Sequence, residues 1–161
     1  MDSIEEVKLR VRISASDVHY AGNLVDGSHI MQLFGDVATE LTIRYDGDEG
    51  LLRAYESVEF LEPVHGGDFL EIVGKITHVG NTSRKILFEA YKIISPANNQ
   101  YQESACDILN PPILVAKAIG VSVVTKNKQR KQIQGLQSND DIIEDFNKIK
   151  SGEPSRMSQK T

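Results

Sequence analysis

The sequence of 161 residues lacks several features that would assign it to large classes of protein. It contains one cysteine, Cys106, which excludes an intramolecular disulfide and indicates a reducing compartment. It has no apolar run of about 18 residues and no basic and apolar leader, so we expect neither a membrane span nor a secretion signal. The net charge of −5 and the lack of a basic stripe argue against nucleic-acid binding. We therefore expect a cytoplasmic protein that binds neither nucleic acid nor membrane.

The composition predicts one domain followed by a tail. The chain is long enough for one hydrophobic core and too short for two. Residues 1–125 carry a net charge of −8, whereas residues 126–161 are polar and carry +3. We expect residues 1–125 to form the domain. We expect residues 126–161 to form a polar C-terminal tail with one short amphipathic helix at residues 142–149 and then disorder.

One long amphipathic helix is predicted after a polar, glycine-containing loop. Apolar residues recur along one face at helical spacing, at Ile30, Phe34, Val37 and Leu41. Ser28 is the expected N-cap, and Asp46-Gly47 is expected to end the helix. A loop that leads into a helix N-terminus, with an acid further along, can bind a polarised oxygen and transfer protons beside it.

Five segments have the apolar pattern of β-strands, at residues 7–13, 51–61, 69–79, 85–94 and 113–124. We expect Val58 and Phe60 to point inward, residues 80–83 to form a hairpin turn, and residues 95–112 to form a long polar connection. The last strand is nearly continuous in apolar and small residues, which predicts a central place in the sheet. The order of strand, helix and four strands predicts an α+β fold in which one long helix packs on a mostly antiparallel sheet.

Two sets of motifs resemble known proteins. Residues 58–64 (VEFLEPV), Gly67-Asp68 and residues 79–83 (VGNTS) resemble the signature of hotdog-fold acyl-CoA enzymes. A second set is similar to the small CoA-dependent ammonia lyases of amino-acid fermentation, at residues 17–25 (DVHYAGNLV), 35–41 (GDVATEL), 46–48 (DGD), 88–90 (FEA) and Pro111-Pro112. The similarity covers about residues 7–126. It implies the hotdog fold, a curved antiparallel sheet of about five strands wrapped around one long central helix.

The resemblance implies a carbon–nitrogen lyase that reversibly eliminates ammonia from a 3-aminoacyl-CoA to give the 2-enoyl-CoA. The first choice of substrate pair is 3-aminobutyryl-CoA and crotonyl-CoA, as in lysine fermentation, and the alternative is β-alanyl-CoA. No cofactor is implied, because the thioester acidifies the α-carbon and CoA is part of the substrate. The histidines have no metal-ligand spacing, so no metal site is expected. The resemblance also implies a homodimer or a higher homo-oligomer such as a trimer of dimers, with active sites between subunits.

Several residues are candidates for this chemistry. Backbone N–H groups around Gly27 and Ser28 are the expected donors to the enolate oxygen, with Asn23 beside them. Asp36 is the first choice for the acid/base, because hotdog thioesterases commonly carry their catalytic carboxylate on this helix. Four further candidates are open to a structural reading, since each can equally form a loop hydrogen bond or an ion pair: Glu40, Tyr20, His19 and Glu59.

The expected CoA-binding residues are Asn81, Ser83, Arg84 and Lys85, in and after the hairpin turn, although a solvated hairpin explains the two cations equally well. Two other functions are consistent with the same motifs. An acyl-CoA thioesterase needs only a carboxylate and the same N–H donors. A non-catalytic acyl-CoA-binding module would leave Asp36 in solvent without a catalytic role.

Overall fold

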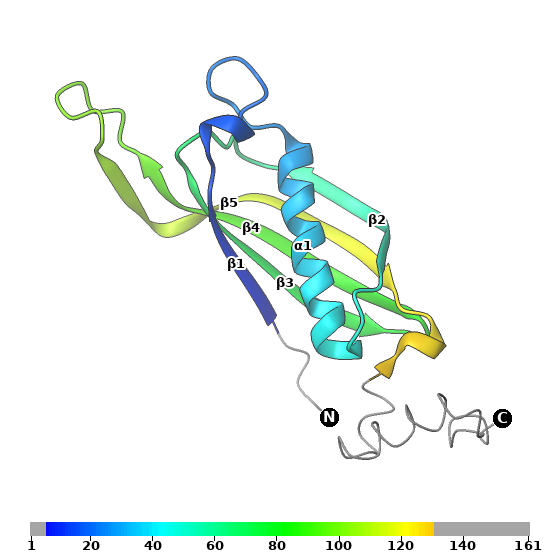
Figure 1. Cartoon of the computed structure of the whole chain (residues 1–161). Coiled ribbons are helices and arrows are strands. Elements are labelled where there is room, and N and C mark those ends of the chain that lie inside the picture. Colours follow the sequence, from blue (N-terminus) through cyan, green and yellow to red (C-terminus); the bar gives the residue numbers. More distant parts are fainter. Residues whose placement is uncertain (1–5, 131–161) are drawn as a thin grey trace, which may run out of the picture.

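The computed structural model describes residues 6–130 of the chain (Figure 1). Its elements are β1 (Glu6–Arg12), α1 (Gly27–Asp46), β2 (Leu51–Phe60), β3 (Phe69–Val79), β4 (Ser83–Pro96) and β5 (Cys106–Val123), with short 3-10 helices at Ala15–Asp17 and Lys126–Lys128. The tail expected at residues 126–161 continues past Arg130, so its expected short helix lies outside the described residues.

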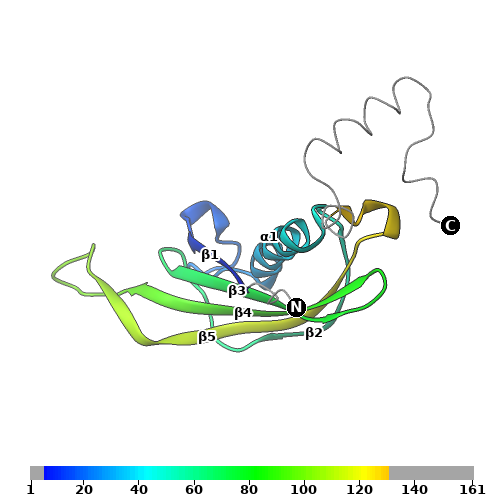
Figure 2. The same ribbon diagram turned by 90° about the horizontal axis from the view of Figure 1, so that it is seen from below.

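The five strands form one antiparallel sheet in the order β1-β3-β4-β5-β2. α1 lies across one face of this sheet, as the two perpendicular views show (Figures 1 and 2). The architecture confirms the expected α+β fold of one long helix on an antiparallel sheet of five strands. The nearly continuous apolar strand, β5, lies between β4 and β2 and is therefore internal to the sheet, as predicted.

The predicted helical stripe faces the sheet. Ile30, Phe34, Val37 and Leu41 are all buried, and the Phe34 ring stacks on Phe88 of β4 with ring centroids 5.1 Å apart. The helix ends as expected at Gly47, which has a left-handed backbone (φ 76°) and donates its N–H to the carbonyl of Ile43 at 2.8 Å. No helix within residues 6–130 is long and apolar enough to cross a membrane.

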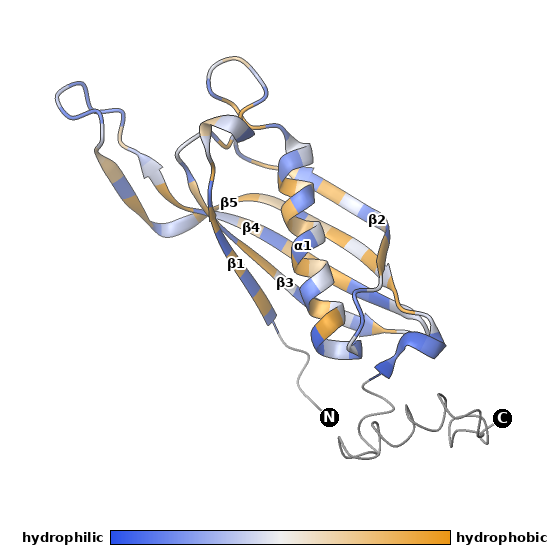
Figure 3. Ribbon diagram, viewed as in Figure 1, coloured by the Kyte–Doolittle hydropathy of each residue, from blue (hydrophilic) through white to orange (hydrophobic). Residues whose placement is uncertain are grey.

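β3 and β4 run directly beneath α1. The expected inward residues of β3, Leu70, Ile72 and Ile76, are buried, and polar and apolar residues alternate along the strands (Figure 3). A Cβ atom at Gly74 would lie 2.4 Å from Val37 Cγ1. Glycine at this position therefore allows the helix to approach the sheet closely.

The outer part of β2 differs from its prediction. Val58 is half-buried, and Phe60 faces the helix as expected, with its ring beside Gly27, but Phe60 lies beyond the buried core and is 52% exposed. β2 pairs with β5 on one side and lies at the edge of the sheet. The sheet side of the core is therefore formed mainly by the internal strands β3, β4 and β5.

The prediction of a polar connection at residues 95–112 is wrong. β4 continues to Pro96 and β5 already begins at Cys106, and the two strands pair beyond the sheet, with Ile94 opposite Ile108 and Pro96 opposite Cys106. We call residues 94–113 the β4–β5 arm. The arm projects away from the body of the molecule (Figures 1 and 2). Polar turn residues at its tip gave the sequence the composition of a loop.

Candidate functional site

The loop before α1 is held in place by hydrogen bonds of its own. The backbone N–H and the hydroxyl of Ser14 both donate to Asp17 Oδ2, at 2.8 and 2.9 Å. The backbone N–H of Ser14 is the main reason that the pKa of Asp17 lies below its ordinary value. The same carboxylate oxygen lies 3.9 Å from His29 Nε2 on the first turn of α1. The loop therefore brings an ionised carboxylate to the start of the helix.

Asn23 joins this loop to the segment before β3. Its backbone is left-handed (φ 62°), its carbonyl accepts the N–H of Gly66 at 3.1 Å, and its side-chain Nδ2 donates to the carbonyl of Gly66 at 3.2 Å. A Cβ at Gly66 would lie 2.7 Å from Asn23 Oδ1. The residue expected to bind substrate thus has a structural contact that fixes the loop against residues 64–66.

The helix begins two residues earlier than expected. Asp26 is the N-cap and Gly27 the first helical residue, so the prediction that Ser28 caps the helix is wrong. The Ser28 hydroxyl donates to Asp26 Oδ2 at 2.5 Å, which is the main cause of the lowered pKa of Asp26. Sequence reasoning passed over Asp26, although an aspartate before glycine and serine at a helix start is a recognised capping signal. A second ionised carboxylate therefore lies at this helix end.

Phe60 covers the first residue of α1. A Cβ atom at Gly27 would lie 2.4 Å from Cζ of the Phe60 ring, and all three nearest atoms belong to that ring. Because successive residues of a strand point to opposite faces, Glu59 points away from α1. Glu59 lies 3.5 Å from Lys117 on β5, and its side chain is 54% exposed. The structure therefore brings Phe60, rather than Glu59, to the helix N-terminus.

The two acids expected on the helix lie away from its N-terminus in this chain. Asp36 is exposed and lies nine residues after Gly27, which corresponds to about 13.5 Å along the helix axis. Glu40 binds Arg44, with Oε1 2.8 Å from both Nε and Nη2 of the guanidinium. Glu40 thus forms an ion pair within the helix, the structural alternative to a catalytic role in the sequence analysis. A single substrate atom held at the helix N-terminus therefore cannot also contact Asp36 of the same chain.

His19 and Tyr20 lie together on the outer side of the loop. Both are exposed, and their rings meet edge to face with centroids 5.2 Å apart. The backbone N–H groups of both residues donate to the carbonyl of Leu24, at 3.2 and 3.0 Å. Their side chains are therefore available to a ligand at the same end of α1 as Asp26.

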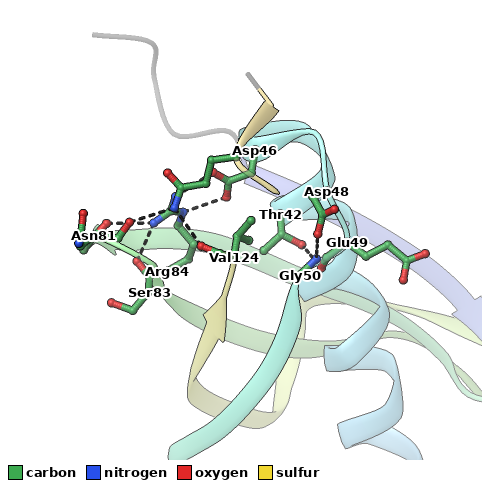
Figure 4. Close-up of polar contacts among 11 residues, drawn as sticks. Thr42, Asp46, Asp48, Glu49, Gly50, Asn81, Ser83, Arg84 and Val124 are labelled. Atoms are coloured by element: carbon green, nitrogen blue, oxygen red, sulfur yellow. Dashed lines mark hydrogen bonds and ion pairs between the residues drawn. The ribbon is translucent and has the colours of Figure 1, made fainter. Parts of the chain in front are cut away.

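In the expected CoA-binding turn at residues 80–83, all four carbonyl groups accept hydrogen bonds from the body of the protein. Figure 4 shows Asn81 and Ser83 of this turn beside Arg84. Gly80 and Ser83 accept from Arg84 Nη1 at 3.0 and 3.1 Å, Asn81 accepts from Gln129 Nε2 at 2.9 Å, and Thr82 accepts from the backbone N–H of Val124 at 2.9 Å.

In a trans peptide the N–H group points opposite to the carbonyl of the preceding residue. The N–H groups of Asn81, Thr82 and Ser83 therefore point away from Arg84, Gln129 and Val124, the residues that bind the preceding carbonyls. Successive outward N–H groups form a cradle suited to an anion such as phosphate. Lys85 follows the turn and lies 3.0 Å from Glu56.

Arg84 does not fit the CoA-binding role expected for it. Its side chain is fully buried and donates from Nε and Nη2 to the two carboxylate oxygens of Asp46 at 2.9 and 2.8 Å (Figure 4). A guanidinium held in this way cannot reach a phosphate without breaking both bonds. Arg84 instead joins the turn to the C-terminal end of α1.

Metal coordination has no support in the described residues. Within residues 6–130, no three His, Cys, Asp or Glu side chains are grouped so that they could hold a metal ion.

Comparison with known proteins shows where this arrangement occurs. Residues 22–93 match the family model of the thioesterase superfamily. The chain is 58% identical over 123 residues to 3-aminobutyryl-CoA ammonia lyase of Acetoanaerobium sticklandii, covering 76% of this chain and 97% of that protein. The matched region of the relative is nearly its whole length.

The chain is also similar to solved structures of enzymes that act on CoA thioesters. β-Alanyl-CoA:ammonia lyase of Clostridium propionicum has a TM-score of 0.75 and 38% identity, covering 78% of this chain and 89% of that one. Acyl-CoA hydrolase of Staphylococcus aureus, solved with butyryl coenzyme A, has a TM-score of 0.59 at 16% identity, covering 77% and 66%, and shares the fold alone. The chain therefore belongs to the CoA-dependent ammonia lyases, carbon–nitrogen lyases with the hotdog fold of the thioesterase superfamily.

Proposed function

We propose that this protein catalyses the reversible elimination of ammonia from 3-aminobutyryl-CoA to give crotonyl-CoA. The observation that carries the proposal is the 58% identity to a 3-aminobutyryl-CoA ammonia lyase over nearly the whole of that enzyme. The structural relative that acts on β-alanyl-CoA is more distant, at 38% identity, and makes β-alanyl-CoA the alternative substrate. A role in lysine fermentation and a cytoplasmic location belong to the same proposal.

The helix N-terminus is suited to the difficult step of the reaction. Removal of the α-proton of a thioester places negative charge on the carbonyl oxygen. Backbone N–H groups at a helix N-terminus stabilise such charge, and Gly27 and Ser28 supply them. The ionised carboxylates of Asp17 and Asp26 lie at the same end and provide the counter-charge for the substrate ammonium. No cofactor is needed for these steps.

Asp36 is the proposed acid/base, and it requires a second subunit. Its distance along the helix, about 13.5 Å from Gly27, is too long for one substrate atom to meet both in the same chain. A homo-oligomer with active sites between subunits removes this difficulty. The ten-residue strand β2 lies at the edge of the sheet and has the free main-chain groups that such pairing uses. Two structures of the same fold are described as hexameric acyl-CoA thioesterases.

The turn at residues 80–83 is the proposed site of the CoA phosphates. Three outward N–H groups meet an anion there without a side-chain charge, and Lys85 lies at the end of the turn. The reactive thioester and the nucleotide are therefore bound by separate elements, the start of α1 and the β3–β4 turn.

A product assay tests the function directly. The protein should convert crotonyl-CoA and ammonium to an aminoacyl-CoA, so that enoyl absorbance falls and no free thiol is released. Acryloyl-CoA in parallel decides between the two lyase substrates. Thiol released at the same rate with and without ammonium would replace the lyase by a thioesterase. No turnover of any acyl-CoA, with binding retained, would indicate a non-catalytic module.

A further inference from the structure

Large exposed apolar side chains gather at one end of the described structure. Of the eight such residues within residues 6–130, all but Ile43 and Leu51 lie at the end that carries the start of α1 and the β4–β5 arm: Tyr20, Phe60, Leu61, Tyr101, Ile108 and Ile113. This is the upper end of the molecule in Figure 1. Exposed apolar side chains concentrated on one part of a surface mark a site of protein association.

The arm cannot bury its own apolar residues. Past Ile94, which is opposite Phe69 of β3, β4 pairs only with β5, and β2 ends opposite Ala116. The arm is thus a two-stranded ribbon, a structure that is marginally stable by itself in water. Tyr101 and Ile108 are nevertheless 89% and 82% exposed. Apolar segments on its strands contrast with its polar tip (Figure 3). The arm therefore needs an external surface to cover it.

The same chain carries a surface that fits the arm. Phe60 and Leu61 are 52% and 45% exposed beside the start of α1. The arm contains two charged residues, both acidic, Glu103 and Asp107. Arg12, an exposed cation, lies at this end on the last position of β1, with its guanidinium 5.5 Å from the centre of the Phe69 ring. An apolar patch with a neighbouring cation complements an apolar arm with two acids.

We propose that the arm of one copy docks on the α1 N-terminal end of a second copy, where Tyr101 and Ile108 pack against Phe60 and Leu61. The twenty residues of the arm match the number that one partner contributes to an interface of standard size, about 20–30. The contact joins two different surfaces, so it is heterologous; contacts of this kind generate rings where the rotation between copies closes and open filaments where it does not. It is distinct from the proposed pairing of β2 edges and rests on the proposal that the protein is a homo-oligomer. The two contacts together build an assembly larger than a dimer.

The experiment uses the full chain and measures its mass by light scattering during size-exclusion chromatography. Ile108→Glu on the arm and Leu61→Lys on the docking surface should each reduce the mass by at least half. The double variant should restore much of the wild-type mass, because the new charges attract each other across the contact. Ile43→Glu changes an apolar residue of similar size that is 45% exposed at the opposite end, and should leave the mass unchanged.

Cys106, the single cysteine of the chain, reports on the same contact. It is exposed in one copy and lies in the arm, so docking should slow its reaction with a thiol reagent, and Ile108→Glu should make the reaction faster by several-fold. Tyr101→Ser, at the tip, repeats the test without a change in strand pairing. Unchanged mass and unchanged thiol reactivity in both arm variants would overturn the proposal, as would a loss of mass from the arm variants without one from Leu61→Lys. These readouts do not depend on lyase activity.

Discussion

Asp46 and Arg84 form an ion pair in which neither side chain has any exposed surface. Asp46 is the last residue of α1, and Arg84 is the second residue of β4. Two hydrogen bonds, at 2.8 and 2.9 Å, join Nη2 and Nε of the guanidinium to the two carboxylate oxygens. The pair links the end of the helix to the proposed phosphate turn.

Removal of one member of this pair should destabilise the protein strongly. Asp46→Asn leaves a buried guanidinium without its counter-charge, a change that typically costs about 3–5 kcal/mol. The free energy of unfolding in urea measures the effect. Glu40→Gln removes an exposed ion pair of the same helix, and its effect should stay below about 1 kcal/mol. An equal loss of unfolding free energy in the two variants would show that the buried Asp46–Arg84 pair stabilises the protein no more than the exposed pair does.

Two glycines of α1 should respond to alanine in opposite directions. At Gly27 a Cβ would lie 2.4 Å from the Phe60 ring, whereas at Gly35 it would meet nothing within 4 Å. Gly35→Ala should stabilise the helix by about 0.5–1 kcal/mol, the usual propensity gain. Gly27→Ala should cost about 1–3 kcal/mol unless Phe60 is also shortened. A double-mutant cycle with Phe60→Ala measures that coupling, and a coupling energy near zero would contradict the contact.

Asp36 on α1 and Asp26 at its N-cap should affect different kinetic parameters. Asp36→Asn should lower the turnover of the lyase reaction by roughly two to four orders of magnitude, the usual contribution of a positioned acid/base. Asp26→Asn should mainly raise KM for the aminoacyl-CoA, because asparagine keeps an oxygen that can accept from the Ser28 hydroxyl but offers the ammonium no charge. Steady-state kinetics separate the two effects, and circular dichroism checks the fold. Wild-type turnover in a folded Asp36→Asn protein would remove Asp36 from the mechanism.

Tyr91 should titrate well above the ordinary pKa of a tyrosine. The hydrogen bond that its hydroxyl donates to Glu89 raises the pKa of Tyr91 from 10.0 to about 12. The folded-state pKa is thus above the unfolded value, so this contribution to stability is complete below pH 10 and is lost as the pH rises from 10 to 12. Phenolate absorbance against pH measures the titration. Glu89→Gln should move the step near pH 12 toward pH 10, and Tyr91→Phe should abolish it; a step near pH 12 that persists in both variants would contradict the assignment.

Periodic patterns made most of the fold predictable from sequence. The helix stripe from Ile30 to Leu41 and the alternation in β3 reflect burial against one surface, which the order of residues records directly. The arm was not predictable in this way, because two paired strands with no core beneath them need no apolar alternation. Phe60 was assigned to the core for the opposite reason, since it continues an alternating pattern past the point where the core ends.

The candidate site was less predictable, because its contacts join distant residues. Asp46 and Arg84 are 38 positions apart in the sequence. The residues around a hairpin turn do not show whether an arginine beside the turn faces solvent or the core. Asp26 was within reach of local reasoning, because capping depends on neighbouring residues. Asp36 and Glu40 share a helix face in the sequence, but only the structure shows that Glu40 is bound to Arg44.

The turn at residues 80–83 offers its N–H groups rather than its side chains, and this has a consequence for how the family can diverge. Under the proposed role of this turn, side-chain substitutions at Asn81 and Thr82 leave the main-chain donors in place, so we expect these two positions to vary among related sequences. The constraint falls instead on the buried residues that hold the carbonyls inward, Arg84 and Gln129. In related sequences, the identity of these two hidden residues should therefore follow the capacity to bind CoA more faithfully than any residue on the surface of the turn.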